Sequence, residues 1–267
     1  MTRDDLILLL ALGLVFAPLE WLWPIRRRRP GWPRLWTDVA HVFISGSLIR
    51  WGSAVLLMGL VASLGAWSPG WVSPQVRAQP LWLQYVELLV LSDLGFYLAH
   101  RLFHAVPFLW RFHEVHHSSE HLDWIAAYRV HPVDQVLNAA IIALPAIVLG
   151  FSPEALLIHG LVYRWHSILL HSNVRVNFGP LKWLVASPHF HHWHHADEAW
   201  AYDRNFGGQL ILFDWLFGTL NLPVGKTPQK YGLSEPIGEG YLAQLAHPFR
   251  PVAPAPTPVA RTDPAEA

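Results

Sequence analysis

Histidine is the residue of this chain whose placement most clearly indicates chemistry. Of its 17 histidines, six lie between His100 and His121 and five lie between His189 and His195. The first cluster contains HRLFH and HEVHH, and the second is HFHHWHH. Neutral imidazole is a common metal ligand. Two dense clusters far apart in the sequence therefore predict a metal site that forms when the chain folds.

The spacing inside the clusters is that of ligands carried by helices. His100 and His104 are four residues apart, and the motif HxxHH occurs twice. Offsets of three and four bring side chains to one face of a helix. The predicted ligands from the three boxes are His100, His104, His113, His116, His117, His191, His194 and His195. Eight imidazoles exceed the three or four protein ligands of one zinc ion, and His166 and His171 lie nearby. The set therefore favours two metals.

The composition indicates a membrane protein. Apolar residues make up 52% of the chain, charged residues only 14%, and there are 15 tryptophans. This balance is unusual for a soluble domain. The formal net charge is zero, so no overall field favours nucleic acid as a partner. The chain has no cysteine, which excludes disulfides, thiolate-held iron–sulfur clusters and thiolate-bound haem.

Several apolar segments approach the roughly 20 residues that span a bilayer. They cover residues 6–23, 39–67, 81–99, 136–151 and 155–170. The last two are short, and the Gly-Phe-Ser-Pro sequence between them predicts a helical hairpin. We expect an all-α integral membrane protein with four or five membrane helices and a helical cap that carries the histidine boxes.

Topology and domain limits follow from the same pattern. The basic run Arg26–Arg29 should stay cytoplasmic. Counting the segments from that run places every histidine box on the cytoplasmic side. The predicted regions are an N-terminal membrane anchor over residues 1–80, a catalytic domain over 81–222, and an extension over 223–267. The end of that extension is rich in Pro and Ala and is predicted to be disordered.

A metal site against a membrane suggests an apolar substrate that enters from the lipid. An alkyl C–H bond has no acidic proton and no leaving group, so acid–base catalysis cannot attack it. Oxidation of such a bond needs dioxygen and a redox metal, and two irons can share the electrons. Imidazole ligands alone do not choose between zinc, copper, iron and nickel.

The order of the motifs resembles that of the fatty acid hydroxylase / sterol desaturase superfamily. The matching motifs are HRLFH, HEVHH, HSN, SPHFHHWHH, DRNFG and FDWLFGT, over about residues 90–219. The resemblance implies a membrane-embedded di-iron oxygenase acting on a sterol, fatty acyl chain, sphingolipid, alkylglycerol or carotenoid. The ligands it implies are His100, His104, His113, His116, His117, His171, His191, His194 and His195, with His166 as a tenth.

The implied cofactors and partners complete this hypothesis. We expect two Fe ions, which Zn can replace during expression, and O2 as the co-substrate. Because the chain has no convincing flavin, nicotinamide or iron–sulfur motif, electrons must come from a separate reductase, ferredoxin or cytochrome. The lipid, the carbon that is oxidised and the oligomeric state stay open.

Several polar residues could support the ligands. The candidates are Asp93, His131, Asp134, His189, His192, Asp203, Asn205 and Asp214. An acid inside an apolar helix is a functional candidate by default. Asp93 could therefore orient a ligand histidine, and a bond to Tyr97 or Ser92 is an equal alternative.

Three other functions stay open at this point. Desaturation on the same metals is the nearest alternative. HEVHH also matches the zinc motif HExxH, with His113 and His117 as ligands and Glu114 as base, although this leaves the other boxes unexplained. A haem carrier or metal transporter is the third. A haem carrier needs paired histidines within the bilayer, and a transporter needs polar groups through its spans.

Overall fold

A computed structural model describes residues 3–27, 31–64, 72–176 and 178–251. Helices and loops make up this part of the chain, and its only β contacts are isolated bridges. The all-α prediction is therefore confirmed. The α-helices are α1 (Arg3–Leu22), α2 (Trp32–Ala40), α3 (Gly46–Leu64), α4 (Val72–Ala78), α5 (Leu81–Ala105), α6 (Pro107–His117), α7 (Pro132–Leu149), α8 (Pro153–His171), α9 (Pro188–His194), α10 (Leu212–Leu216) and α11 (Tyr241–Ala246).

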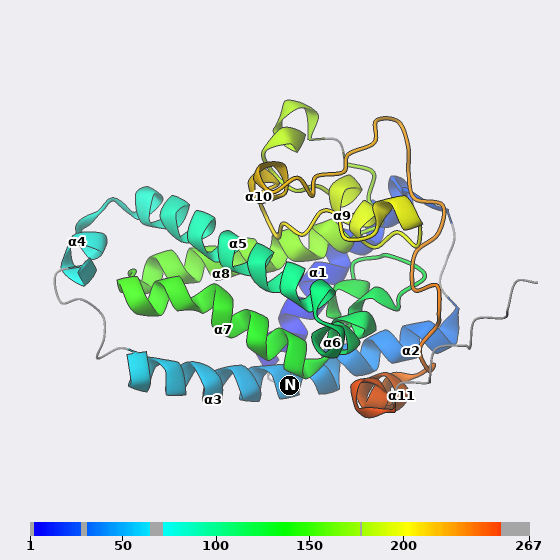
Figure 1. Cartoon of the computed structure of the whole chain (residues 1–267), viewed down its shortest axis with the longest axis horizontal. Helices are drawn as coiled ribbons and strands as arrows, with labels where there is room; N and C mark the ends of the chain where they lie inside the picture. Colours follow the sequence, from blue (N-terminus) through cyan, green and yellow to red (C-terminus); the bar gives the residue numbers. More distant parts are fainter. Residues whose placement is uncertain (1–2, 28–30, 65–71, 177, 252–267) are drawn as a thin grey trace, which may run out of the picture.

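The long helices form one elongated body. Helix α7 packs against α3 and α5, and α5 also packs against α8. Figure 1 shows these four helices side by side, with α2, α6, α9 and α11 toward one end and α4 at the other. A π-helical turn, His41–Ser45, joins α2 to α3. The residues that carry the histidine boxes therefore lie at one end of a helical bundle.

Three helical segments are long and apolar enough to cross a membrane. They are Arg34–Leu64, Leu81–Ala105 and Pro132–Leu149, while the apolar part of α1, Leu9–Leu22, is shorter. On α3, Trp51, Val55 and Met58 are exposed, as expected of side chains that face lipid. The larger number of spans and the cytoplasmic position of the boxes stay predictions.

Local sequence explains where the helices begin. Helices α6, α7, α8 and α9 each have a proline in the first turn, where its missing N–H and fixed φ cost nothing. Ser152 and Ser187 accept hydrogen bonds from the N–H groups of the first turns of α8 and α9. Helix α7 ends at Leu149 and is capped by Gly150, which has φ 73°, so the predicted hairpin turn begins with a left-handed residue.

The described part of the C-terminal extension is folded onto the rest. The side chain of Gln244 in α11 bonds to His41, with 3.0 Å between its Oε1 and the imidazole Nε2. Arg111 in α6 donates to the carbonyl of His247 at 2.8 Å. The predicted disordered tail falls mainly on residues 252–267, which lie outside the described residues. The predicted limits of the three regions stay predictions.

Candidate metal centre

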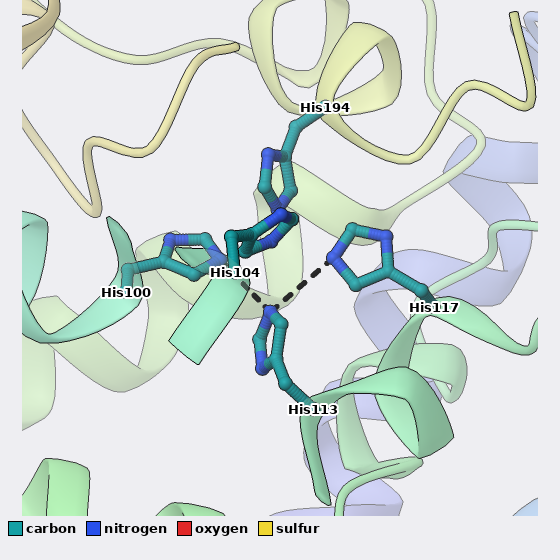
Figure 2. Close-up of side chains that lie close together, drawn as sticks. All are labelled: His100, His104, His113, His117 and His194. Atoms are coloured by element: carbon teal, nitrogen blue, oxygen red, sulfur yellow. Dashed lines mark hydrogen bonds between the residues drawn. The ribbon is translucent and has the colours of Figure 1, made fainter. Parts of the chain in front are cut away.

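Nine of the ten predicted ligand histidines converge in two groups. The five-histidine group consists of His100, His104, His113, His117 and His194, and Figure 2 shows its rings pointing toward a common centre. The four-histidine group consists of His116, His171, His191 and His195. Within each group, the ligand atoms lie within 4.8 Å of one another.

Each HxxHH box contributes to both groups. In α6, His113 and His117 join the five-histidine group, whereas His116 joins the four-histidine group. In the second box, on α9 and the residue that caps it, the division is reversed, since His191 and His195 point to the four-histidine group and His194 to the other. Around a helix, the side chain at i+4 lies about 40° from that at i, whereas the side chain at i+3 lies about 60° away in the opposite direction. A box of three histidines on one helix can therefore serve two metals on either side of it.

The two groups adjoin each other. The rings of His117 and His195 stack with centroids 4.4 Å apart, and those of His116 and His195 are 4.7 Å apart. Close contacts within the groups join Nε2 to Nε2: His100–His113 2.9 Å, His113–His117 3.2 Å, His116–His171 3.0 Å, His171–His191 2.9 Å and His191–His195 3.1 Å. Ligands at right angles on an ion with bonds of about 2.1 Å are roughly 3.0 Å apart.

Six of the nine imidazoles are held by their outer nitrogen. The Nδ1 partners are Phe206 O for His100, Asp203 Oδ1 for His104, Asp134 Oδ2 for His113, Arg129 O for His116, Ser167 O for His171 and Arg204 O for His194. Carbonyl and carboxylate oxygens only accept, so each Nδ1 must carry the proton. The inner Nε2 of each of these neutral rings then carries a lone pair that points into the group. This is the usual arrangement around metal-bound histidine.

The arrangement of the imidazoles favours a cation between them. Burial lowers the pKa of His113 to about 3 and that of His116 to about 4, and it holds those of His194 and His195 well below the usual value. The rings are therefore neutral, and facing lone pairs about 3 Å apart repel each other unless a cation lies between them. The Nε2 atoms of His104 and His194 are buried without a hydrogen-bond partner. The donor set thus fits metal ions that accept nitrogen ligands.

Two of the predicted supporting residues touch ligands. The Asp134 carboxylate accepts from His113 Nδ1 at 2.8 Å and is fully buried. Asp203 Oδ1 lies 3.2 Å from His104 Nδ1, and its side chain is exposed. These contacts fix the orientation of one ring on α6 and one ring on α5.

Other predicted residues build the surrounding fold instead. Asp93 accepts from the backbone N–H of Gln209 at 2.7 Å and of Leu210 at 3.0 Å. It therefore contacts neither a ligand histidine nor, through those two bonds, the side chains proposed as its alternative partners. Asp214 accepts from the N–H groups of Phe206 and Gly207, so it shapes the loop that supplies the carbonyl for His100.

The remaining supporting candidates also lie away from the two groups. His131 caps the start of α7, His189 bonds to the carbonyl of Lys226, and His192 bonds to Tyr231 and to the carbonyl of Ser172. Asn205 donates to the carbonyls of Phe190 and Asn221. These bonds tie the loops around α9 together.

His166, the tenth predicted ligand, is not brought to either group. Its Nε2 bonds to the carbonyl of Ala186 at 2.9 Å. It lines an apolar groove of about 550 Å³ together with Phe16, Leu89 and Val162. The structure thus separates His166 from His171, which lies on the same helix.

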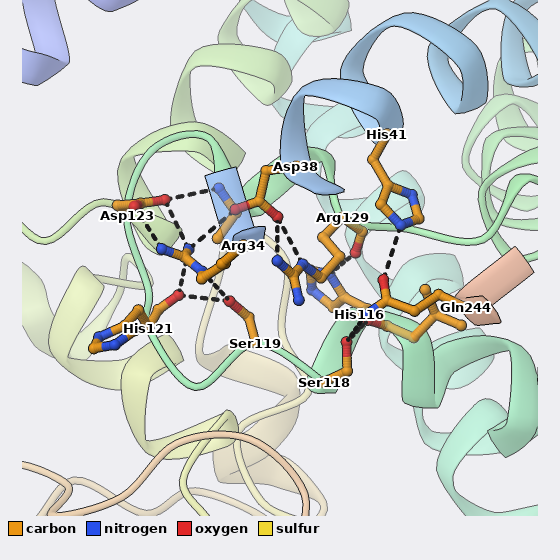
Figure 3. A network of polar contacts seen from close by, with 12 residues as sticks. Arg34, Asp38, His41, His116, Ser118, Ser119, His121, Asp123, Arg129 and Gln244 are labelled. Atoms are coloured by element: carbon orange, nitrogen blue, oxygen red, sulfur yellow. Dashed lines mark hydrogen bonds and ion pairs between the residues drawn. The ribbon is translucent and has the colours of Figure 1, made fainter. Parts of the chain in front are cut away.

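Sequence reasoning missed the backbone carbonyls and one buried ion pair. The carbonyl of Arg129 holds His116, and the guanidinium of Arg129 donates to Asp38 of α2 at 2.6 Å. Arg34 bonds to Asp123 and to the carbonyl of His121, so that α2 is tied to the loop after α6 (Figure 3). Carbonyl partners have no sequence signature, and nothing in the sequence pairs Asp38 with Arg129.

Comparison with known proteins supports the resemblance. The family model described as Fatty acid hydroxylase matches residues 85–219. The chain is 31% identical to an ornithine lipid hydroxylase of Rhizobium tropici, over 90% of this chain and 72% of the relative. It is 30% identical to an alkylglycerol monooxygenase of Danio rerio, over 78% of this chain and 47% of the relative.

A third relative extends the range of similar enzymes. A Delta(7)-sterol-C5(6)-desaturase of Nicotiana tabacum is 28% identical over 83% of this chain and 93% of its own length. The chain spans about half the length of the alkylglycerol monooxygenase, and no solved structure matches it. The family model covers half of the chain, and its range contains all nine converging histidines. The chain therefore belongs to the fatty acid hydroxylase family.

Proposed function

We propose that this protein is a membrane-bound di-iron oxygenase that hydroxylates a C–H bond of a lipid. One observation carries the proposal. Nine imidazoles, eight of them on buried residues and the ninth on the half-buried His104, form two adjoining groups, and six of the nine are fixed by outer hydrogen bonds that leave Nε2 free to bind a metal. Two groups of this size suit two metal ions, and nitrogen donors suit iron.

The overall reaction balances with an external donor. One atom of O2 enters the C–H bond to give C–OH, and the other leaves as water after taking up two electrons and two protons. Two iron ions in the two groups would supply the activation of dioxygen that this reaction needs. Because the sequence has no convincing motif for a bound electron carrier, we include a separate donor in the proposal.

The chain's own residues hold and shield the centre. The outer bonds from Asp134, Asp203 and four carbonyls keep the rings in one tautomer and one orientation. The Phe206 ring lies 5.0 Å from that of His104, and the Trp110 ring lies 4.8 Å from it. These two aromatic rings pack against one ligand of the five-histidine group.

We base the proposal of a lipid substrate on the names of the relatives and on an apolar groove in the surface. The printed names of the relatives specify ornithine lipid, alkylglycerol and sterol. The groove of about 550 Å³ is lined mainly by apolar side chains from α1, α5 and α8, as expected of a site for an alkyl chain. We place the centre at the cytoplasmic surface on the basis of the Arg26–Arg29 run.

The geometry disfavours a zinc hydrolase built on HEVHH. His113 and His117 belong to a group of five imidazoles, whereas a HExxH zinc site uses two histidines and leaves a position for water. The carboxylate of Glu114 accepts from His247 Nε2 at 2.6 Å, so its shortest contact is not with a metal ligand.

Metal analysis tests the centre. We expect about two irons per chain in protein purified with iron supplied, and about one in His194→Ala or in His195→Ala. His189→Ala is the matched control, because this histidine lies on the same helix and faces away from both groups; it should keep both irons. A single tightly held zinc that survives His194→Ala would contradict the proposal.

Labelled dioxygen separates hydroxylation from desaturation. Membranes that contain the iron-loaded protein, a reductase system and lipid are supplied with ¹⁸O2, and the lipids are analysed by mass spectrometry. Hydroxylation adds one labelled oxygen, whereas desaturation removes two hydrogens and adds no label. Loss of two hydrogens without label would replace the proposed reaction by its nearest alternative.

A further inference from the structure

Trp110 of α6 packs against three ligands of the five-histidine group. The centre of its ring lies 4.8 Å from that of His104, 5.3 Å from that of His117 and 6.1 Å from that of His113. His117 and His113 lie on the same helix as Trp110, and His104 lies on α5. The indole therefore lies directly against ligands from two helices.

Trp110 differs chemically from the other rings in contact with ligands. Apart from the histidines themselves, those described rings belong to Phe96, Phe103 and Phe206. An electron leaves an indole far more easily than a benzene ring, and the indole also carries an N–H proton that it can release. The chain has no cysteine and only two methionines, the residues that are oxidised most readily elsewhere. Trp110 is therefore the readily oxidised side chain among the described rings that contact ligands.

A cavity connects this indole with the protein surface. The cavity has a volume of about 390 Å³, and its wall includes Trp110, His104 and His117. Its wall also includes Asp203, whose side chain is 73% exposed. Trp110 itself is half-buried. Water and small solutes can therefore reach the indole from the side that faces away from the ligands.

The proposed reaction gives such a side chain a role. O2 needs four electrons to become two waters, and in hydroxylation two come from the external donor and two from the lipid C–H bond. When no lipid is bound, the second pair must come from another source. Oxidation of a ligand histidine would destroy the metal site, whereas an electron from the adjacent indole spares the ligands.

We infer that Trp110 supplies electrons to the centre when O2 is activated without a lipid, and so protects the ligand histidines from oxidation. The inference rests on the proposed function. In each step the Trp110 indole gives one electron to the centre and its N–H proton to water in the cavity, which leaves an indolyl radical. A small reductant in the cavity, such as a phenol, returns one electron and one proton to the indole. Two such steps complete the reduction of the second oxygen atom to water.

Oxygen added to the protein tests this route. Iron-loaded full-length protein in detergent, without added lipid, is supplied with ¹⁸O2 and a reductase system, and its peptides are analysed by mass spectrometry. An indolyl radical that is not reduced adds O2, so we expect labelled oxygen mainly on Trp110. A neutral phenol in the buffer should remove this label, and zinc-loaded protein should show none.

Two other tryptophans serve as internal controls. Trp193 lies on α9 between two ligands, but its described ring contacts are with His189 and Trp200. Trp183 is 57% exposed, so oxygen radicals that diffuse through the solvent would reach it more easily than Trp110. Label mainly on Trp183, or equal label on all three tryptophans, would overturn the inference.

A matched pair of variants tests the protection. Trp110→Phe keeps a ring at the position but removes the electron source, so we expect the label to move to His104 and His117, followed by loss of iron. Trp200→Phe is the control, because this tryptophan is 50% exposed and packs on Trp193; it should keep the label on Trp110. Metal analysis before exposure to O2 shows whether both variants still hold two irons. Label that stays off the ligand histidines in an iron-loaded Trp110→Phe protein would overturn the inference.

Electron paramagnetic resonance identifies the radical in the wild type and does not depend on any variant. Samples frozen during O2 consumption without lipid should show a radical whose spectrum narrows when the protein contains ring-deuterated tryptophan. Absence of this signal, together with unlabelled Trp110, would overturn the inference.

O2 consumption separates this inference from the proposed function. Lipid hydroxylation by a protein whose Trp110 stays unlabelled in the absence of lipid overturns the inference and keeps the function. A protein with two irons that consumes no O2 contradicts both. A role of Trp110 in electron entry is the competing explanation. In that case Trp110→Phe would slow O2 consumption and leave the ligand histidines unlabelled, and that result would also overturn the inference.

Discussion

The hydrogen bond between Asp134 and His113 provides the sharpest test of the metal centre. Asp134 is fully buried, and its Oδ2 accepts from His113 Nδ1 at 2.8 Å. Its other oxygen accepts from Asn138. In Asp134→Asn the shape is kept but the negative charge is lost. If the new amide turns its NH2 toward His113, the imidazole proton must move to Nε2, which blocks the atom that faces the five-histidine group.

The size of the effect follows from this contact. Loss of a partner that orients a metal-bound histidine typically costs about 10–100-fold in metal affinity, or roughly 1.4–2.7 kcal/mol. His113 belongs to the five-histidine group alone. We therefore expect one of two metal-binding steps to weaken by that factor, while the other step, whose ligands do not include His113, weakens less.

Chelator competition with zinc, a redox-inert probe, measures both steps on the folded protein. Asp203→Asn is the matched control, because this carboxylate also contacts a ligand histidine but its side chain is 73% exposed. An exposed pair contributes at most about 1 kcal/mol, so this variant should lose fivefold or less. Unchanged binding in Asp134→Asn would refute the assignment, and equal weakening of both steps would show that Asp134 acts on the whole fold.

Three further predictions concern residues around the centre. His166→Ala should keep two irons in metal analysis, because His166 bonds to a carbonyl and joins neither group. Asp38→Ala leaves the buried Arg129 charge uncompensated and should cost about 3–5 kcal/mol of stability, measured by denaturant unfolding and partly recovered by adding Arg129→Leu. Burial lowers the pKa of His113 to about 3 and that of His116 to about 4, so the unfolded chain binds more protons below pH 6.5 or so. The metal-free protein should therefore lose stability as the pH falls from about 6.5 to about 4; constant stability over that range would contradict the burial of these rings as neutral groups.

The sequence predicted the converging histidines because their spacing is helical. The offsets of three and four in α6 and α9 depend only on the helix repeat. The assignment of each ring to one group depends on how α6 and α9 are rotated between α5 and α8, and no local pattern records that rotation. His166 shows the limit clearly. It is five residues from His171, or roughly 140° around the helix, and so points to the apolar groove.

Asp93 shows why an intramembrane acid was given the wrong partner. The default interpretation ties such a residue to function, but its carboxylate holds the backbone N–H groups of Gln209 and Leu210, over 100 positions away in the chain. The neighbouring Gly208 has no room for a side chain, since a Cβ would lie 2.9 Å from Asp93 Oδ1. A partner made of backbone atoms in a distant turn leaves no trace in residue types.

The sharing of α6 and α9 between the two groups has a consequence for metal binding. Helix α5 contributes ligands to the five-histidine group alone. Helix α9 and the residue that caps it contribute His194 to that group and His191 and His195 to the other. A metal in the five-histidine group that binds His194 therefore also restrains the helix that carries two ligands of the second metal. The second metal should bind more tightly to a chain that already holds the first, because part of the ordering cost has been met.

Two alanine variants distinguish this coupling from independent sites. His104→Ala removes a ligand on α5 and should weaken mainly the step assigned to the five-histidine group. His194→Ala removes the link through α9 and should weaken both steps, by an added factor of about 5 or more at the four-histidine group, the lower range of coupling between sites. Chelator competition on both variants gives the two constants. If the four-histidine step is the same in both variants, the two metals bind independently, and the shared helices hold their positions without metal.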